Sequence, residues 1–247
     1  MILTGHQPVY LPWLGLFHKI ALADLYCYFD VAQYQTKDYN NRNRIKTHDG
    51  AIWLSVPVES KNHFEKRVGE IRIVQNGWQR KHLKSIQIAY QKAPHFSLYI
   101  KGIESLLNSH SSGSLGDLNL EMLRFFLRCL DIRTPIVKAS EYQFEGAKSD
   151  LVLDMCIKLG ADVYIFGAQG KNYADVGKFR SSGIEPHFQQ YNCPSYRQLY
   201  GDFLPYMSVI DLLFNEGPAS REIIMAGNVT RESLVNQSGD VAQSEPV

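Results

Sequence analysis

The sequence predicts an α/β fold with a parallel-stranded, Rossmann-like core and a mostly helical appendage. Residues 1–4 and 25–30 are short apolar runs typical of buried strands, and residues 13–23 between them carry apolar side chains at helical spacing. Short connections join the three segments, and two parallel strands need a crossover helix of this kind. A third apolar run, residues 162–166, ends at Gly167 and predicts a further parallel strand.

The remaining elements follow from apolar periodicity and from the positions of glycine and proline. We expect strands at residues 52–58, 69–74 and 135–138, and helices at residues 78–90, 96–108, 118–130, 149–159 and 203–214. The polar stretch 38–46, rich in Asn and Arg, is expected to be a loop. Residues 1–227 then form a single α/β domain with a helical insertion at roughly 78–130. The periodicity ends after residue 227, which predicts a disordered tail over residues 228–247.

Composition indicates a globular protein without a strong overall electric field. Of the 247 residues, 45% are hydrophobic and 21% are charged, and the formal net charge is +1, so no nucleic-acid partner is expected. No window reaches the roughly 20 apolar residues of a membrane span, and the first residues lack the features of a signal peptide. We therefore expect a cytoplasmic protein without membrane insertion. The four widely spaced cysteines form no zinc-ligand pattern, and neither a metal nor another cofactor is expected.

The first candidate site is the turn between the first strand and the first helix, which carries His6, Gln7, Tyr10 and Trp13. Open α/β sheets bind ligands outside the carboxyl ends of their strands, and a helix N-terminus at that place favours an anion such as phosphate. His6 fits either a general base or a hydrogen-bond donor to phosphate. A structural histidine that caps the turn is the alternative.

The second candidate site follows the second strand, where Asp30, Gln33 and Tyr34 lie at or just beyond the strand end. An aspartate at this place in an α/β protein often holds a ribose or sugar hydroxyl, or orients a catalytic histidine. An aspartate that only shapes the turn is the competing interpretation.

The polar stretch that follows is unusually cationic for this nearly neutral chain. Residues 37–46 contain Lys37, Arg42, Arg44 and Lys46, together with Asn41 and Asn43. This local excess of positive charge predicts an anion site, and a diphosphate would fit it. Asn41, Arg42 and Asn43 are the selected binding residues, with a solvated loop as the alternative.

Two later segments add candidate binding residues. Gly167, Gly170 and Tyr173 follow the strand at 162–166, and two glycines let backbone N–H groups approach a ligand closely. The spacing matches neither a Walker loop nor a dinucleotide-binding fingerprint, and an ordinary turn is the alternative. Tyr196 and Gln198 are expected on a loop that faces the site.

The motifs of this chain, taken together, resemble those of the WbqC-like family, which is found with bacterial O-antigen and other surface-polysaccharide genes. The resemblance rests on GHQPVYLPWLGLFHKIALAD, NRNRIK, WLSVPV, YQKAPHF, GKNYAD and MSVIDLLFN, and it runs over roughly residues 1–217. It implies an enzyme that modifies a sugar or amino-sugar intermediate by transfer of an acyl or aminoacyl group such as glycyl. The family-motif positions it implies, without roles, are His6, Gln7, Pro8, Tyr10, Trp13, Asn41, Arg42 and Asn43. Ala139 stands where the family is expected to favour serine.

The leading hypothesis is therefore a transferase that acts on a nucleotide-linked amino sugar, with an acyl carrier protein as one candidate donor. In this hypothesis Arg42 and Asn43 hold the diphosphate, Tyr10 and Trp13 stack on base or sugar, and His6 takes the proton of the attacking amine. Asp30 would orient His6 or a substrate hydroxyl. The alternatives are a nucleotidyltransferase or adenylate-forming ligase, and a non-catalytic sugar-nucleotide-binding protein. The opening segment also resembles nucleotidyltransferase-like α/β enzymes, but their paired HxGH histidines are absent.

Overall fold

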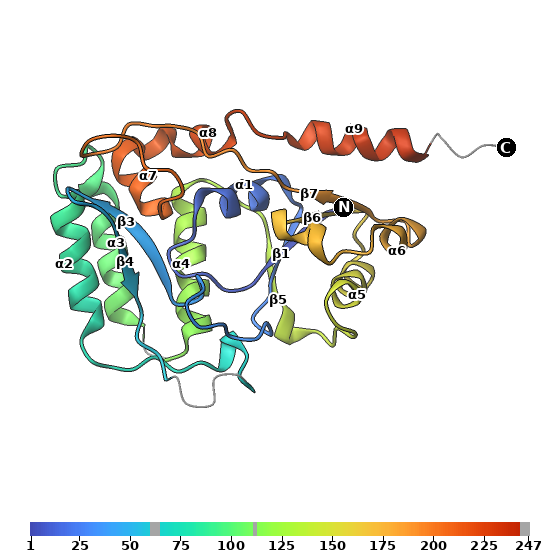
Figure 1. Cartoon of the computed structure of the whole chain (residues 1–247), viewed down its shortest axis with the longest axis horizontal. Helices are drawn as coiled ribbons and strands as arrows, with labels where there is room; N and C mark the ends of the chain where they lie inside the picture. The colour runs from blue at the N-terminus through green and yellow to red at the C-terminus, as the bar shows by residue number, and fades with distance from the viewer. Residues whose placement is uncertain (60–64, 111–112, 243–247) are drawn as a thin grey trace.

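A five-stranded parallel sheet forms the centre of the computed structural model, which describes residues 1–59, 65–110 and 113–242 (Figure 1). Its order is β5-β2-β1-β6-β7, and every neighbouring pair is parallel. The strands are β1 (Ile2–His6), β2 (Leu25–Tyr28), β5 (Ile136–Lys138), β6 (Val163–Phe166) and β7 (Glu185–Phe188). This sheet and the helices around it confirm the predicted α/β fold with a Rossmann-like core.

Helix α1 (Leu14–Leu22) connects β1 to β2 and is buried along almost its whole length. Because β1 lies between β2 and β6, the chain leaves β1 toward one side of the sheet and later returns on the other. This change of direction is a topological switch point, where open α/β sheets leave a crevice at the carboxyl ends of the strands.

Helices cover both faces of the sheet. On one face α5 (Ser149–Leu159) and α6 (Val176–Ser181) contribute Met155 and Phe179 to an apolar cluster with Leu3 of β1. At the opposite end of the molecule lie the helices of the appendage, which share a larger apolar cluster with α1 (Figure 1). They are α2 (Trp78–Tyr90), α3 (Phe96–Ser109), α4 (Leu115–Cys129) and α7 (Val209–Glu216).

The prediction of a loop over residues 38–46 is wrong for its second half, because strand β3 begins at Arg42 and spans Arg42–Thr47. It pairs in antiparallel fashion with β4 (Gly50–Ser55) in a separate two-stranded sheet. The buried residues of β3 are Asn43, Ile45 and Lys46. The strand does not stand out in the sequence, because two of these three buried residues are polar and no apolar alternation is visible.

Three other segments differ from the sequence assignments. Residues 69–74 form no regular strand, because the segment begins as the 3₁₀ turn η2 (Val68–Glu70) and then makes only isolated bridges. The last predicted helix starts at Val209 rather than at residue 203, since Ser208 caps it. Strand β7 was not predicted because it contains Pro186, a residue that sheets tolerate on an edge strand such as this one.

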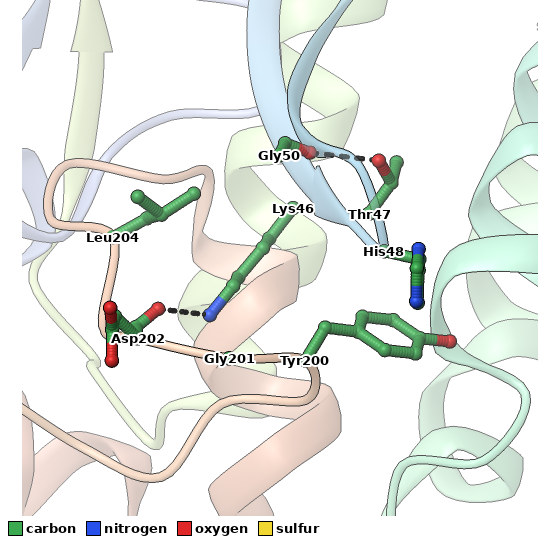
Figure 2. Close-up of a pocket in the computed structure, with 8 residues that line it drawn as sticks. All are labelled: Lys46, Thr47, His48, Gly50, Tyr200, Gly201, Asp202 and Leu204. Atoms are coloured by element: carbon green, nitrogen blue, oxygen red, sulfur yellow. Dashed lines mark hydrogen bonds between the residues drawn. The ribbon is translucent and has the colours of Figure 1, made fainter.

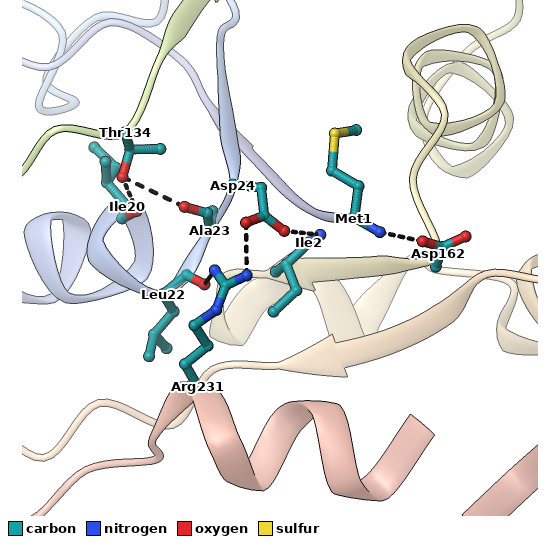
Figure 3. Close-up of polar contacts among 9 residues, drawn as sticks. All are labelled: Met1, Ile2, Ile20, Leu22, Ala23, Asp24, Thr134, Asp162 and Arg231. Carbon is teal, nitrogen blue, oxygen red and sulfur yellow. Dashed lines mark hydrogen bonds and ion pairs between the residues drawn. The ribbon is translucent and has the colours of Figure 1, made fainter. Parts of the chain in front are cut away.

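After residue 227, where the sequence predicts a disordered tail, the chain forms helix α9 (Arg231–Ala242). The guanidinium of Arg231 donates to the carboxylate of Asp24 at 2.6 Å and to the carbonyl of Leu22 at 3.1 Å (Figure 3). Leu234 is buried in an apolar cluster that includes Ile2. The contacts that hold this helix join residues more than 200 positions apart in the sequence, so local periodicity could not predict them. Residues 243–247 of the expected tail lie outside the described part of the chain.

Candidate functional site

A cleft of about 1210 Å³ opens at the carboxyl ends of β1 and β6, the position of the switch point. Its floor and walls come from the end of β1, the first turns of α1, the segment at 35–39, α5 and the loop after β6. The predicted residues that line it are His6, Gln7, Trp13, Gly167, Gly170 and Tyr173. All of them follow a parallel strand directly or belong to the turn after it, so the strand-end argument accounts for their convergence.

His6 is held in one orientation by its own backbone neighbour. Its Nδ1 lies 2.8 Å from the carbonyl oxygen of Gln7, and because a carbonyl only accepts, Nδ1 carries the proton. Nε2 is then the atom with a free lone pair. The indole of Trp13 meets the imidazole edge to face, with ring centroids 5.2 Å apart. Burial, reinforced by the charge of Lys19, lowers the pKa of His6 to about 4, so the ring is neutral at physiological pH.

Lys19 is a residue of the cleft that the sequence interpretation missed. It lies on α1, lines the cleft, and is only 2% exposed. Its Nζ donates to the carbonyl of Gly5 at 3.0 Å. Burial lowers the pKa of this ammonium to about 7. The signal was present as a lysine inside the apolar run LGLFHKIAL, where the helix leaves few positions exposed.

Positive charge exceeds negative charge on the cleft lining. Lys37 and Lys148 line it together with Lys19, whereas Asp38 is the one carboxylate among the lining residues. Asp38 already accepts a hydrogen bond from the amide of Gln7 at 3.1 Å. In a chain with a net charge of +1, this local excess favours an anionic ligand in the cleft.

The two glycines after β6 have different structural roles. A Cβ at Gly170 would lie 2.5 Å from the Cβ of Phe166, so this glycine allows the turn η4 (Ala168–Asn172) to pack on the strand end. A Cβ at Gly167 would meet nothing within 4 Å. Gly167 therefore leaves open space at the cleft, while Tyr173 adds a half-exposed aromatic ring to its wall.

The structure places Tyr10, Asn41 and Asn43 away from the cleft, although the sequence interpretation assigned them to the ligand. Tyr10 is fully buried, and its hydroxyl lies 2.8 Å from Nδ1 of His82, so it cannot stack on a base or sugar. The amides of Asn43 and Asn41 donate to the carbonyls of Leu11 at 2.6 Å and Val56 at 2.8 Å. Their role is to satisfy backbone groups around the hairpin.

Arg42 and Gln33 also lie outside the cleft lining. The guanidinium of Arg42 stacks over the ring of Trp53 at 4.4 Å from its centroid and donates to the carbonyl of Lys37. Gln33 is exposed and forms a β-bridge with Arg67. The residues expected to hold a diphosphate, Arg42 and Asn43, are therefore not part of the cleft, and their side chains contact Trp53 and the carbonyl of Leu11.

Asp30 does not contact His6. Its carboxylate accepts from the backbone N–H of Ser140 at 2.9 Å and from the Ser140 hydroxyl at 2.6 Å, with the Lys138 ammonium 3.7 Å away. The predicted orienting role is thus replaced by a structural one, the attachment of the end of β2 to the turn after β5. A hydroxyl at position 139, absent here, is not needed for this contact.

Tyr196 and Gln198 belong to a buried network behind the hairpin. The Asp211 carboxylate accepts from the hydroxyls of Tyr90 and Tyr196, each at 2.8 Å, and from the Gln198 amide at 2.9 Å. Burial raises the pKa of Asp211, and these hydrogen bonds limit the rise. The same network joins the segment at residues 196–204 to α7 and the hairpin, and neither predicted residue lines the large cleft.

A second, smaller pocket of about 410 Å³ lies beside this network, at the tip of the hairpin. In Figure 2 the Lys46 side chain points across it to the backbone of Asp202, where its Nζ donates at 2.5 Å. Lys46 also donates to the side-chain oxygen of Gln198 at 3.1 Å. Because the Lys46 ammonium is already used to hold the segment of Gln198 and Asp202 against the hairpin, this pocket is a weaker candidate for ligand binding than the cleft.

A model of the WbqC-like protein family matches residues 7–223, most of the chain. The chain belongs to the WbqC-like protein family. This membership confirms the resemblance carried by the sequence motifs. An uncharacterised protein of Mycobacterium tuberculosis is 31% identical over 212 residues, covering 85% of this chain and 92% of the relative. Neither match names a reaction or a substrate.

Two features of the described residues concern membranes and metals. No helix in this part of the chain is long and apolar enough to cross a membrane. Within the same residues, no three His, Cys, Asp or Glu side chains come close enough together to hold a metal ion.

Proposed function

We propose that this WbqC-like protein is a cytoplasmic transferase that moves an acyl or aminoacyl group, such as glycyl, onto a nucleotide-linked amino sugar for bacterial surface-polysaccharide (O-antigen) biosynthesis. The observation that carries the proposal is the neutral His6 beside a cationic cleft at the switch point. A nucleotide-linked sugar supplies the negative charge that such a cleft favours. The cleft volume of about 1210 Å³ is ample for a ligand of that size.

His6 supplies the proton-accepting group of this reaction. The amine of the sugar attacks the acyl carbonyl of the donor, an acylated carrier-protein thioester. It must lose a proton as the new C–N bond forms; the C–S bond to the carrier breaks, and the carrier leaves as a thiol that takes up that proton. Nε2 of His6 can accept that proton, because Nδ1 is already protonated and fixed on the Gln7 carbonyl. The low pKa makes His6 a weak base by itself, and an anion bound nearby would raise this pKa by stabilising the imidazolium.

Replacement of His6 tests this role. His6→Gln should lower product formation from nucleotide-linked amino sugars by about 10²- to 10⁴-fold, the usual contribution of a general base, as measured by mass spectrometry of the product. His48→Gln is the matched control, because His48 is exposed at the hairpin tip and lies outside the cleft. Turnover by His6→Gln within about threefold of the unmodified protein would remove the base from the mechanism.

The same cleft is compatible with the two alternatives, and binding experiments separate them. Calorimetric titration against nucleotide sugars and against ATP and CTP distinguishes the transferase from a nucleotidyltransferase or adenylate-forming ligase, which would consume a triphosphate with Mg²⁺. Nucleotide-sugar binding without any modified product, in the presence of acylated carrier protein as donor, would leave a non-catalytic binding protein.

A further inference from the structure

Lys19 is a buried lysine without an anionic partner in the part of the chain that the structure describes. Its Nζ has one hydrogen-bond acceptor, the Gly5 carbonyl at 3.0 Å, and an ammonium can donate three hydrogen bonds. Among the ion pairs of the described residues, none includes Lys19. A buried charge is normally paired, since its desolvation costs several kcal/mol. The described residues therefore supply no counter-ion for Lys19.

The ionisable groups that line the cleft with Lys19 do not provide the missing negative charge. The charged or ionisable groups on the lining besides the tyrosines are His6 on β1, Lys37 and Asp38 on the segment after β2, and Lys148 beside α5. The Asp38 carboxylate raises the pKa of His6, whereas burial is the cause of the lowered pKa of Lys19. The tyrosines on the lining are Tyr39, Tyr164, Tyr173, Tyr191 and Tyr206. Burial raises the pKa of Tyr164, Tyr173 and Tyr191, so these phenols stay neutral and provide no counter-charge.

We propose that Lys19 is the anchor for one phosphate of a diphosphate-containing ligand, bound in the cleft beside His6. The ligand class rests on the proposed function, and the position rests on the burial of Lys19. A phosphate at Nζ would fill the donor sites that the Gly5 carbonyl leaves free. Lys37 and Lys148 are exposed on the same lining and would face the second phosphate. The diphosphate subsite thus lies at α1, and not at Arg42 and Asn43.

Anion binding at this lysine has a signature that a surface lysine lacks. At pH 8 the buried amine is mostly neutral, because its pKa is about 7. A phosphate stabilises the ammonium form, so the protein takes up a proton when the ligand binds. An arginine at the same position would already be charged and would bind without proton uptake.

Calorimetry with inorganic pyrophosphate and with UDP, at pH 8 in two buffers of different ionisation enthalpy, measures affinity and proton uptake together. With UDP, whose phosphates are fully deprotonated at pH 8, the unmodified protein should take up close to one proton per ligand; pyrophosphate, which still carries a proton at this pH, reports affinity. Lys19→Met should weaken binding of both probes by about ten- to a hundredfold, the effect of one charge-assisted contact. Lys19→Arg should keep binding without uptake, and His6→Gln should keep the uptake. Lys178→Met is the control, because Lys178 is exposed and paired with Asp150.

Three results would overturn the inference. They are an affinity of Lys19→Met within twofold of the unmodified protein, a loss confined to UDP, and no pyrophosphate binding by the unmodified protein at millimolar concentration. A thermal melt of Lys19→Met confirms that the variant is folded. Lys19-dependent binding without any transfer product would remove the proposed function and keep this subsite. Turnover that depends on His6, with ligand binding unchanged in Lys19→Met, would keep the proposed function and remove the phosphate subsite at Lys19.

Discussion

Replacement of Lys19 by methionine should stabilise the protein, which is the opposite of what most buried substitutions do. The pKa of Lys19 falls from 10.5 to about 7 on burial, a difference of about 3.5 units. At about 1.36 kcal/mol per unit, the charged amine costs the folded state about 5 kcal/mol when it is protonated in both states. Methionine is apolar and of similar length. Methionine cannot donate a hydrogen bond to the Gly5 carbonyl, which offsets part of the gain. We therefore expect the free energy of unfolding to rise by about 1–4 kcal/mol at pH 7, as for buried charges replaced by apolar side chains.

The stability gained by Lys19→Met should depend on pH in a defined direction. Between pH 7 and 10.5 the unfolded chain holds a proton on Lys19 that the folded protein has released, so the free energy of unfolding rises with pH. The slope from this one group approaches about 1.4 kcal/mol per pH unit. Below pH 7 the penalty is fully present, and above 10.5 it is gone. The advantage of Lys19→Met should therefore shrink as the pH rises from 7 toward 10.

Urea unfolding of both proteins at several pH values across that window measures the difference, and taking the difference cancels the titration of other groups. Lys178→Met serves again as the exposed control and should show no such trend. The reasoning is refuted if Lys19→Met is less stable at pH 7, or if its difference from the unmodified protein does not change with pH. Higher stability with weaker ligand binding would be the expected combination for a residue kept for function.

The remaining predictions concern the glycine turn and the buried network. Gly170→Ala should destabilise the protein by about 1–3 kcal/mol, because its Cβ would meet Phe166 at 2.5 Å, while Gly167→Ala should stay within about 0.5 kcal/mol. Thermal unfolding compares the two, and equal melting temperatures would contradict the packing argument. Tyr196→Phe removes one of three hydrogen bonds to the Asp211 carboxylate and should cost about 1.5–3 kcal/mol of stability. Its pyrophosphate affinity should not change, since Tyr196 lies outside the cleft; a binding defect without a stability loss would place Tyr196 in the site.

The parts of the fold that could be predicted are those in which local periodicity and burial agree. The strand-helix-strand unit of β1, α1 and β2 is predominantly apolar, and α2 and α5 were located to the residue. Strand β3 was missed because two of its three buried residues are an asparagine and a lysine, although it pairs with the neighbouring strand β4. Helix α9 was missed because its contacts are made to the first strand unit, far away in the sequence.

The same distinction explains which site residues were located. His6 and Gly167 were chosen because they follow parallel strands, and sheet geometry brings those ends to one edge. Arg42 and Tyr10 were chosen by residue type, and type does not reveal whether a side chain is already used by a neighbour such as Trp53 or His82. Topology therefore predicted position, while composition alone could not.

The two buried lysines among the described residues show why Lys19 is more than a structural residue. Lys46 is 3% exposed and Lys19 is 2% exposed, so both lose nearly all contact with water. Lys46 has two oxygen acceptors, and its charge acts on the nearby Asp211 carboxylate, so the fold provides for it. Lys19 has one backbone carbonyl and faces a cleft lined by other cations. A lysine that served only the fold would resemble Lys46; the energetic cost of Lys19 is explained by an anion that enters from outside.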